Sequence, residues 1–155
     1  MPLSKILLIS TLTFVSLSAW ALEEIHLQCK RFENGYTEEY EMKIVPASGN
    51  RKAKVYLDDR DLDRSDEYGN QLVKSVTLVR PKIAIWVEAS FEPENVTGVS
   101  YPAGTVSTQI TIDTMTGKLK KTEKIQGGIL GATMGNGTRF SEEDCLLSQA
   151  RNKAQ

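Results

Sequence analysis

Alternation of apolar and polar residues with a period of two recurs along most of this chain, and this pattern restricts the fold more than any other feature. Side chains along a strand point alternately to the two faces of a sheet, so segments of this kind form half-buried strands. In EEIHLQC, for example, Ile25, Leu27 and Cys29 share one face. The same pattern is found in YTEEYEMKI, KAKVYLD, QLVKSVTLV, KIAIWVEAS, TVSTQITID and KLKKTEKI. About seven or eight short strands predict an all-β fold, an antiparallel barrel or a barrel-like sandwich.

Turn residues separate these strands. Pro81 cannot donate to a sheet ladder and marks a turn or an edge, and the segment 113–117, which ends in glycine, is suited to a hairpin turn. One short C-terminal helix is predicted over about 142–151, because Ser141 can cap its first turn and an acidic residue three positions later completes a capping box. The alternative for this segment is another strand, which would carry Cys145.

The amino-terminal residues have the composition of a secretory signal peptide. Lys5 precedes an apolar run over 6–17, and Ala19-Trp20-Ala21 places small residues at the positions that a signal peptidase recognises. We therefore expect a signal peptide over 1–21 and a single β domain over 22–155. The apolar run is shorter than the roughly 20 residues of a spanning helix, so we expect a periplasmic or secreted protein with no membrane span after signal removal.

Two cysteines, Cys29 and Cys145, lie near the two ends of the expected mature chain. In an exported protein, an even number of cysteines favours a disulfide bond. Such a bond requires the first and last elements of the fold to lie side by side. The alternative is two free thiols; a catalytic cysteine is not indicated, because no catalytic motif accompanies either residue.

The charge balance argues against a nucleic acid partner. The chain has 19 Lys and Arg against 20 Asp and Glu, whereas phosphate binding requires a basic excess on one face. The one cationic cluster, LKKTEK at 119–124, is typical of a solvated strand edge.

The stretch GGILGATMGNG, residues 127–137, contains five glycines. It lacks the lysine that follows the last glycine of a phosphate-binding loop, and its glycine spacing does not match a dinucleotide fingerprint. A flexible connector is the main prediction for this stretch. The alternative is a lid over a cavity, formed through Ile129, Leu130 and Met134.

Two further features could suggest a metal site. The stretch 58–70, DDRDLDRSDEYGN, has the alternate carboxylates of a calcium loop, but Arg64 stands where that loop needs glycine and Asn70 where it needs glutamate. A solvated turn is therefore expected. His26, the only histidine, falls on the polar face of its strand; we expect it to be solvent-exposed, and one histidine cannot form a His-based zinc centre. The sequence thus predicts no metal, no cofactor and no catalytic residue.

The expected signal peptide, Cys29, the hairpin ITIDTMTGKL at 110–119 and Cys145 together resemble a family. They resemble small, uncharacterised exported β-proteins of Gram-negative bacteria, whose penultimate hairpin follows the pattern ID-x-x-T-G-x-L and whose terminal cysteines pair. This resemblance implies a periplasmic β-protein with a terminal disulfide and no catalytic residues. A looser similarity to small periplasmic lysozyme-inhibitor barrels extends to architecture and disulfide style, without an inhibitor loop motif.

Function is expected to be binding without catalysis, because no group of residues supplies a nucleophile with its base or a metal with its ligands. The expected partner is a small apolar ligand in a barrel mouth or a protein on the barrel rim. The alternative is a periplasmic enzyme inhibitor or envelope-stress factor that acts through a loop. The candidate interaction surface joins three segments, 58–70, 92–104 and 127–137, at one end of the barrel.

Overall fold

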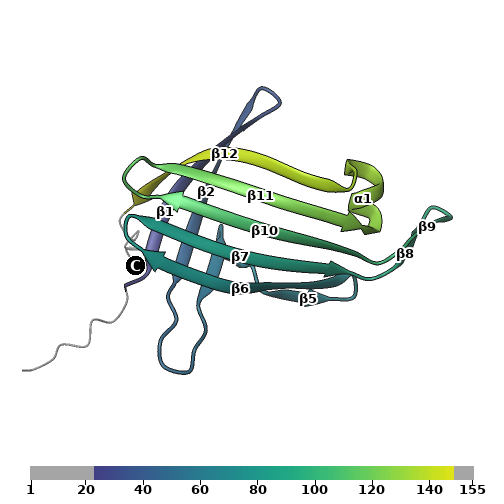
Figure 1. The fold of residues 1–155 in the computed structure, drawn as a ribbon, viewed down its shortest axis with the longest axis horizontal. Helices are drawn as coiled ribbons and strands as arrows, with labels where there is room; N and C mark the ends of the chain where they lie inside the picture. The colour runs from purple at the N-terminus through teal and green to yellow at the C-terminus, as the bar shows by residue number, and fades with distance from the viewer. Residues whose placement is uncertain (1–22, 149–155) are drawn as a thin grey trace, which may run out of the picture.

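The computed structural model describes residues 23–148, most of which form antiparallel β-sheet (Figure 1). The expected signal peptide lies outside the described residues. The elements in chain order are β1 Ile25–Glu33, β2 Tyr36–Val45, β3 Lys54–Leu57, β4 Arg60–Asp61, β5 Arg64–Asp66, β6 Gly69–Val79, β7 Lys82–Phe91, β8 Glu94–Val96, β9 Val99–Tyr101, β10 Gly104–Asp113, β11 Lys118–Gly127, α1 Gly128–Met134 and β12 Gly137–Ser148. Among the described residues, no helix is long and apolar enough to cross a membrane.

Ten of the strands form one sheet in the order β4-β3-β2-β1-β12-β11-β10-β7-β6-β5, and β8 and β9 form a separate hairpin. The sheet curls so that the β1–β2 hairpin crosses behind β10, β11 and β12 (Figure 1). The predicted all-β, barrel-like fold is confirmed. There are more strands than the predicted seven or eight, because β4, β5, β8 and β9 are only two or three residues long, which is too short for an alternating pattern to be recognised.

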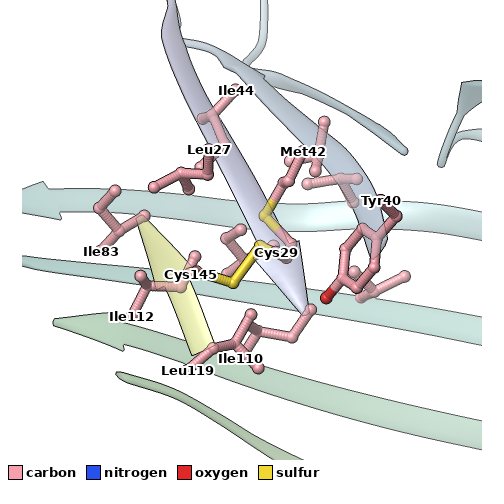
Figure 2. Close-up of a cluster of buried hydrophobic side chains, with 14 residues drawn as sticks. Leu27, Cys29, Tyr40, Met42, Ile44, Ile83, Ile110, Ile112, Leu119 and Cys145 are labelled. Carbon is pink, nitrogen blue, oxygen red and sulfur yellow. A yellow bond between two sulfur atoms is a disulfide. The ribbon is translucent and has the colours of Figure 1, made fainter. Parts of the chain in front are cut away.

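The apolar core lies on the inward face of the curled sheet, as the period-two pattern predicts (Figure 2). Its fully buried large side chains come from β1, β2 and β3 at one end of the chain and from β10 and β11 much later: Leu27, Met42, Ile44, Val55, Ile112 and Leu119. Cys29 and Cys145 are directly opposite each other in the β1–β12 ladder and form a disulfide at the centre of this core. The disulfide prediction is confirmed, and such a bond is consistent with an oxidising compartment.

The helix predicted over 142–151 is wrong for its described part, because residues 137–148 form the long strand β12. Along β12 the side chains alternate: Glu143 and Cys145 are buried, whereas Glu142 and Asp144 are exposed. β12 pairs with β11 on one side and with β1 on the other. These two ladders and the disulfide outweigh the local capping signal at Ser141, and the short helix occurs earlier in the chain, as α1.

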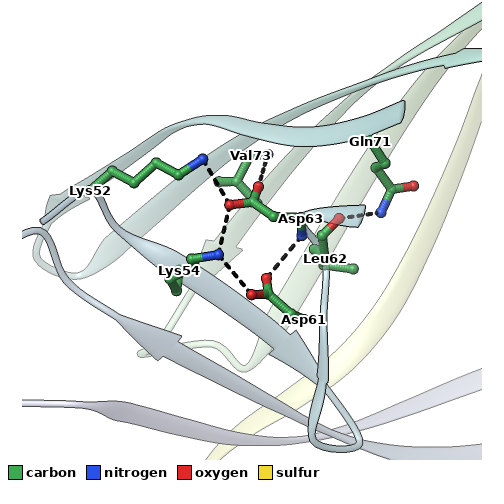
Figure 3. A network of polar contacts seen from close by, with 7 residues as sticks. All are labelled: Lys52, Lys54, Asp61, Leu62, Asp63, Gln71 and Val73. Carbon is green, nitrogen blue, oxygen red and sulfur yellow. Dashed lines mark hydrogen bonds and ion pairs between the residues drawn. The ribbon is translucent and has the colours of Figure 1, made fainter. Parts of the chain in front are cut away.

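The two edge strands of the sheet, β4 and β5, follow each other in the chain, so residues 60–66 form a seam where the sheet meets itself. Hydrogen bonds outside the β3–β4 and β5–β6 ladders also join the seam to both of its neighbours. The amide of Leu62 donates to the carbonyl of Val55 on β3 (2.9 Å). Across the seam, the amide of Val73 donates to Asp63 Oδ1 (2.7 Å) and Gln71 Nε2 donates to the carbonyl of Leu62 (2.8 Å) (Figure 3). The barrel is thus nearly closed.

Ion pairs reinforce the seam. Asp63 Oδ2 lies 2.8 Å from Lys52 Nζ and 3.0 Å from Lys54 Nζ, and Lys54 also contacts Asp61 (2.7 Å). The Asp63 side chain is only 9% exposed. Burial alone would raise the pKa of Asp63, but hydrogen bonds from Lys52, the Val73 amide and Lys54 lower it to about 2. The solvated turn expected over 58–70 therefore describes the exposed residues 58–60 and 64–68 but not Asp61 and Asp63, whose carboxylates bind lysines where the barrel closes.

Candidate functional site

Three segments leave the sheet at the same end of the barrel. Gly104 at the start of β10 is directly opposite Gly127 at the end of β11, and on its other side it is opposite Phe91 of β7. Phe91 is in turn opposite Gly69 at the start of β6. We call the group formed by Glu67 and Tyr68, the β8–β9 hairpin and α1 the barrel-end surface. It contains part of each of the three segments, 58–70, 92–104 and 127–137, that the sequence suggests as an interaction surface.

The barrel-end surface is joined by direct contacts. The amide of Glu92 donates to the carbonyl of Tyr68 (3.1 Å), which ties the β7–β8 connection to the β5–β6 turn. Helix α1 packs against β10 and β11 and also contacts β9. The first half of the expected segment 58–70 lies elsewhere: the amide of Asp58 donates to the carbonyl of Glu41 of β2, and Asp63 belongs to the seam.

Close main-chain contacts hold the glycine-rich stretch in place. A Cβ atom added at Gly104 would lie 2.6 Å from the amide nitrogen of Gly128, so these two backbones touch. The amide of Gly127 donates to Asn136 Oδ1 (2.7 Å), and a Cβ atom at Gly131 would lie 2.5 Å from the same oxygen. The stretch connects β11 to β12, as predicted, but it is not irregular throughout, because its first glycines allow the short helix α1 to pack closely against the sheet.

Apolar side chains are exposed on this surface. The exposed fractions are 63% for Tyr68, 51% for Val99, 45% for Met134 and 38% for Val96. A group of exposed apolar side chains on loops that are held in place is typical of an interaction site. The adjacent hollow, beneath Tyr68 and Phe91, has a volume of about 20 Å³, which is room for about one water molecule.

A second hollow, of about 250 Å³, lies where β1 and β12 diverge. The ladder between these strands ends at the pair Lys30 and Asp144, and we call the gap beyond this pair the fork. Arg31 and Glu143 lie in the fork, and the exposed ring of Phe32 lines it. Its volume is slightly below the range of about 300–1,000 Å³ typical of small-molecule sites.

Glu143 is the central residue of a polar network in the fork. Its side chain is 1% exposed, and its Oε1 accepts a hydrogen bond from Arg31 Nε (3.1 Å). Its Oε2 accepts a hydrogen bond from the hydroxyl of Tyr40. Burial, followed by the contact with Glu143, raises the pKa of that hydroxyl. Both carboxylate oxygens therefore accept a hydrogen bond, as expected for a residue that joins β12 to β1 and β2.

Sequence reasoning did not identify Glu143. A signal was present, since Glu143 is two residues before Cys145 and so shares its inward face in a strand. Because a helix is predicted for this segment, residues two apart are not expected on the same face, and Glu143 is not predicted to point inward.

The environment of His26 differs from the one predicted. Its side chain is 12% exposed, with Nδ1 at 3.0 Å from Glu41 Oε1 and Nε2 at 3.4 Å from Glu24 Oε2. The prediction of a solvent-exposed histidine is wrong, because carboxylates from its own segment and from β2 flank the ring. Within residues 23–148, no group of three or more His, Cys, Asp or Glu side chains is arranged to hold a metal ion.

The two site residues predicted from the sequence, Cys29 and Cys145, lie in the core and have a structural role. Of the three segments expected to form an interaction surface, the structure brings parts of 92–104 and 127–137 and the end of 58–70 to the same end of the barrel. Comparisons with models of protein families, with curated proteins and with solved structures gave no match for this chain.

Proposed function

We propose that this protein is an exported, non-catalytic binding protein of the periplasm or of the secreted fraction, and that it binds its partner through the barrel-end surface. One observation carries the proposal. Three segments distant in sequence meet at one end of the barrel and expose Tyr68, Val96, Val99 and Met134 there. Exposed apolar side chains grouped in this way favour an interaction site.

The construction of this surface supports binding by a preformed site. The Gly104–Gly128 contact and the Gly127–Asn136 hydrogen bond hold α1 against the sheet. Loops that are ordered before binding lose less conformational entropy when a partner binds. The disulfide between Cys29 and Cys145 further restrains the barrel that carries them.

A protein partner fits this surface better than a small apolar ligand. The inward face of the barrel is filled by the apolar core, and the hollow beside Tyr68 has room for about one water molecule. The side chains of Val96 and Val99 are exposed on a projecting hairpin (Figure 1). Apolar and aromatic side chains on a projecting surface are suited to the core of a protein interface.

The β8–β9 hairpin favours the second candidate function, a periplasmic enzyme inhibitor or envelope-stress factor that acts through a loop. This hairpin projects beyond the ten-stranded sheet (Figure 1). Its turn is ordered by a hydrogen bond from the amide of Gly98 to Asn95 Oδ1 (3.1 Å). An ordered, projecting hairpin is a suitable element for insertion into a partner's cleft.

Site-specific photo-crosslinking in the cells that make the protein tests the proposal. A photoreactive phenylalanine analogue is placed at Tyr68 or at Val99, and in a control at Thr111, an exposed position near the opposite end of β10. We expect a discrete protein adduct from the two barrel-end positions and none from the control. In addition, Val99→Asp should remove the adduct formed from position 68.

Equal adduct yields at the three positions, or no adduct at the barrel end, would overturn the proposed surface. Native mass spectrometry of protein purified from its own compartment distinguishes a protein partner from a small ligand. If the captured partner is an enzyme and the purified protein lowers its activity, the inhibitor function is supported over simple binding.

A further inference from the structure

One side of β12 is an unpaired strand edge. β11 pairs with β12 from Gly137 to Asp144, whereas β1 pairs with it only from Asp144 to Ser148. Within residues 23–148, no strand therefore covers residues 137–143 on the side facing β1. We call these residues the free edge, and in Figure 1 they run from the fork towards α1. An uncovered strand edge presents main-chain donors and acceptors to another strand.

The free edge, GTRFSEE, has only part of the usual protection against pairing. Arg139 and Glu142 are charged and Glu143 points inward, but the edge contains no proline and no lysine. The side chain of Phe140 is 78% exposed in the middle of the edge. The neighbouring Ser141 Oγ is buried and has no hydrogen-bond partner among the described residues. Both features are explained if another strand covers this edge.

The charges of the free edge favour a second copy of the same strand in antiparallel orientation. The cation, Arg139, is in the first half of the edge, and the anions, Glu142 and Glu143, are in the second half. Antiparallel self-pairing places the cationic half of each copy opposite the acidic half of the other. Parallel pairing would place like charges opposite each other, which is destabilising.

We propose that the free edge is a dimer interface, in which two copies of the protein pair through residues 137–143 about a twofold axis at Phe140. Odd-numbered residues then pair with odd-numbered residues of the second copy, and even-numbered with even-numbered. Inward-facing side chains therefore lie beside inward-facing side chains across the axis, and outward-facing beside outward-facing. Phe140 is opposite Phe140 of the partner subunit on the outward face. Arg139 is opposite Ser141 of the partner subunit on the inward face, where its guanidinium can donate to the hydroxyl that lacks a partner.

The proposed register is compatible with the contacts of the single chain. Arg139 is exposed and donates to the carbonyl of Met134, and a guanidinium has five N–H donors. The exposed position of Phe140 means that it makes few contacts in the monomer, so its burial in a dimer does not disturb the barrel. Pairing through this edge extends one sheet continuously across both copies.

Complementary charge variants test the dimer, with analytical ultracentrifugation of the exported, disulfide-bonded protein as the measurement. The wild-type protein should show twice the monomer mass at high concentration and should dissociate on dilution. Phe140→Lys and Phe140→Glu should each be monomeric, because each places like charges opposite each other at the axis. A mixture of the two variants should regain the dimer mass, because Lys and Glu are then opposite.

The control is Leu146→Lys, an exposed change on the same face of β12 but in the half that pairs with β1; it should dimerise like the wild type. Circular dichroism and thermal unfolding establish that all variants are folded. A wild-type protein that is monomeric at every concentration overturns the proposal. Dimerisation that persists in both Phe140 variants, or that is not regained in their mixture, overturns the proposed register and with it the interface.

Discussion

Replacement of Asp63 by asparagine tests whether the seam closes the barrel electrostatically. Asparagine keeps an oxygen for the amide of Val73 but loses the charge that binds Lys52 and Lys54. The pKa of Asp63 is lowered from 3.8 to about 2, and a shift of this size corresponds to about 2.4 kcal/mol. Because Lys52 is 59% exposed, solvent screening reduces this value, and we expect a loss of about 1–2 kcal/mol.

The pH dependence identifies the cause of this loss. The folded-state pKa of Asp63 is below its unfolded-state value, so the stabilisation is fully present above about pH 5 and is lost as the pH falls through 4 towards 2. Urea unfolding of wild type and Asp63→Asn, measured from pH 6 to pH 2 with the disulfide intact, should show a difference of about 1–2 kcal/mol at pH 6. This difference should shrink towards zero near pH 2.

The matched control is Asp59→Asn, the same chemical change four residues earlier. The Asp59 side chain is 80% exposed and lies 4.0 Å from Lys43 Nζ, so we expect no measurable change in the free energy of unfolding. The electrostatic account of the seam is refuted if Asp63→Asn is as stable as the wild type at pH 6. It is equally refuted if the loss is constant from pH 6 to pH 2.

Three further predictions concern stability measured by urea unfolding. Replacement of both Cys29 and Cys145 by serine removes a cross-link with a sequence separation of 116 and should lower the free energy of unfolding by about 4–5 kcal/mol in the chain-entropy model. A loss below about 1 kcal/mol would contradict that model for this protein. Glu143→Ala removes the hydrogen bonds to the half-buried Arg31 and to the buried hydroxyl of Tyr40 and should cost about 2–3 kcal/mol, whereas Glu142→Ala, with a 66% exposed side chain, should be nearly neutral. Gly104→Ala brings a methyl group against the backbone of α1 and should cost about 1–3 kcal/mol by overpacking; unchanged stability would show that α1 moves freely.

The long strands and the disulfide could be predicted from the sequence because each depends on short-range patterns or on composition. Side-chain alternation in TVSTQITID correctly assigns Ile110 and Ile112 to the buried face. The same pattern places Leu27 and Cys29 in the core. The position of Cys145 near the other end of the chain was enough to suggest its partner. These features require no knowledge of which strands are neighbours.

The local signal around Ser141 led to a wrong assignment, and the turn expected for DDRDLDRSDEYGN did not reveal the role of Asp61 and Asp63. A capping box favours a helix only when no stronger partner is available, and β11 and β1 provide two hydrogen-bonded ladders to β12. The carboxylates of Asp61 and Asp63 are paired by Lys52 and Lys54 of the neighbouring segment, a contact that depends on how the chain turns at the barrel edge. In both cases tertiary neighbours outweighed a local preference.

The sequence by itself determined an all-β chain, the inward faces of its long strands and the cysteine pair. Only the tertiary structure decided that the edges of the sheet meet at Asp63, that Tyr68, the β8–β9 hairpin and α1 share one end, and that residues 137–143 have an uncovered edge. The physical reason is the range of the interactions. Side-chain alternation and turn chemistry act between neighbours in the chain. The closing of the sheet, the meeting of loops at one end and the exposure of a strand edge depend on strand order and register, which are set by contacts between distant residues.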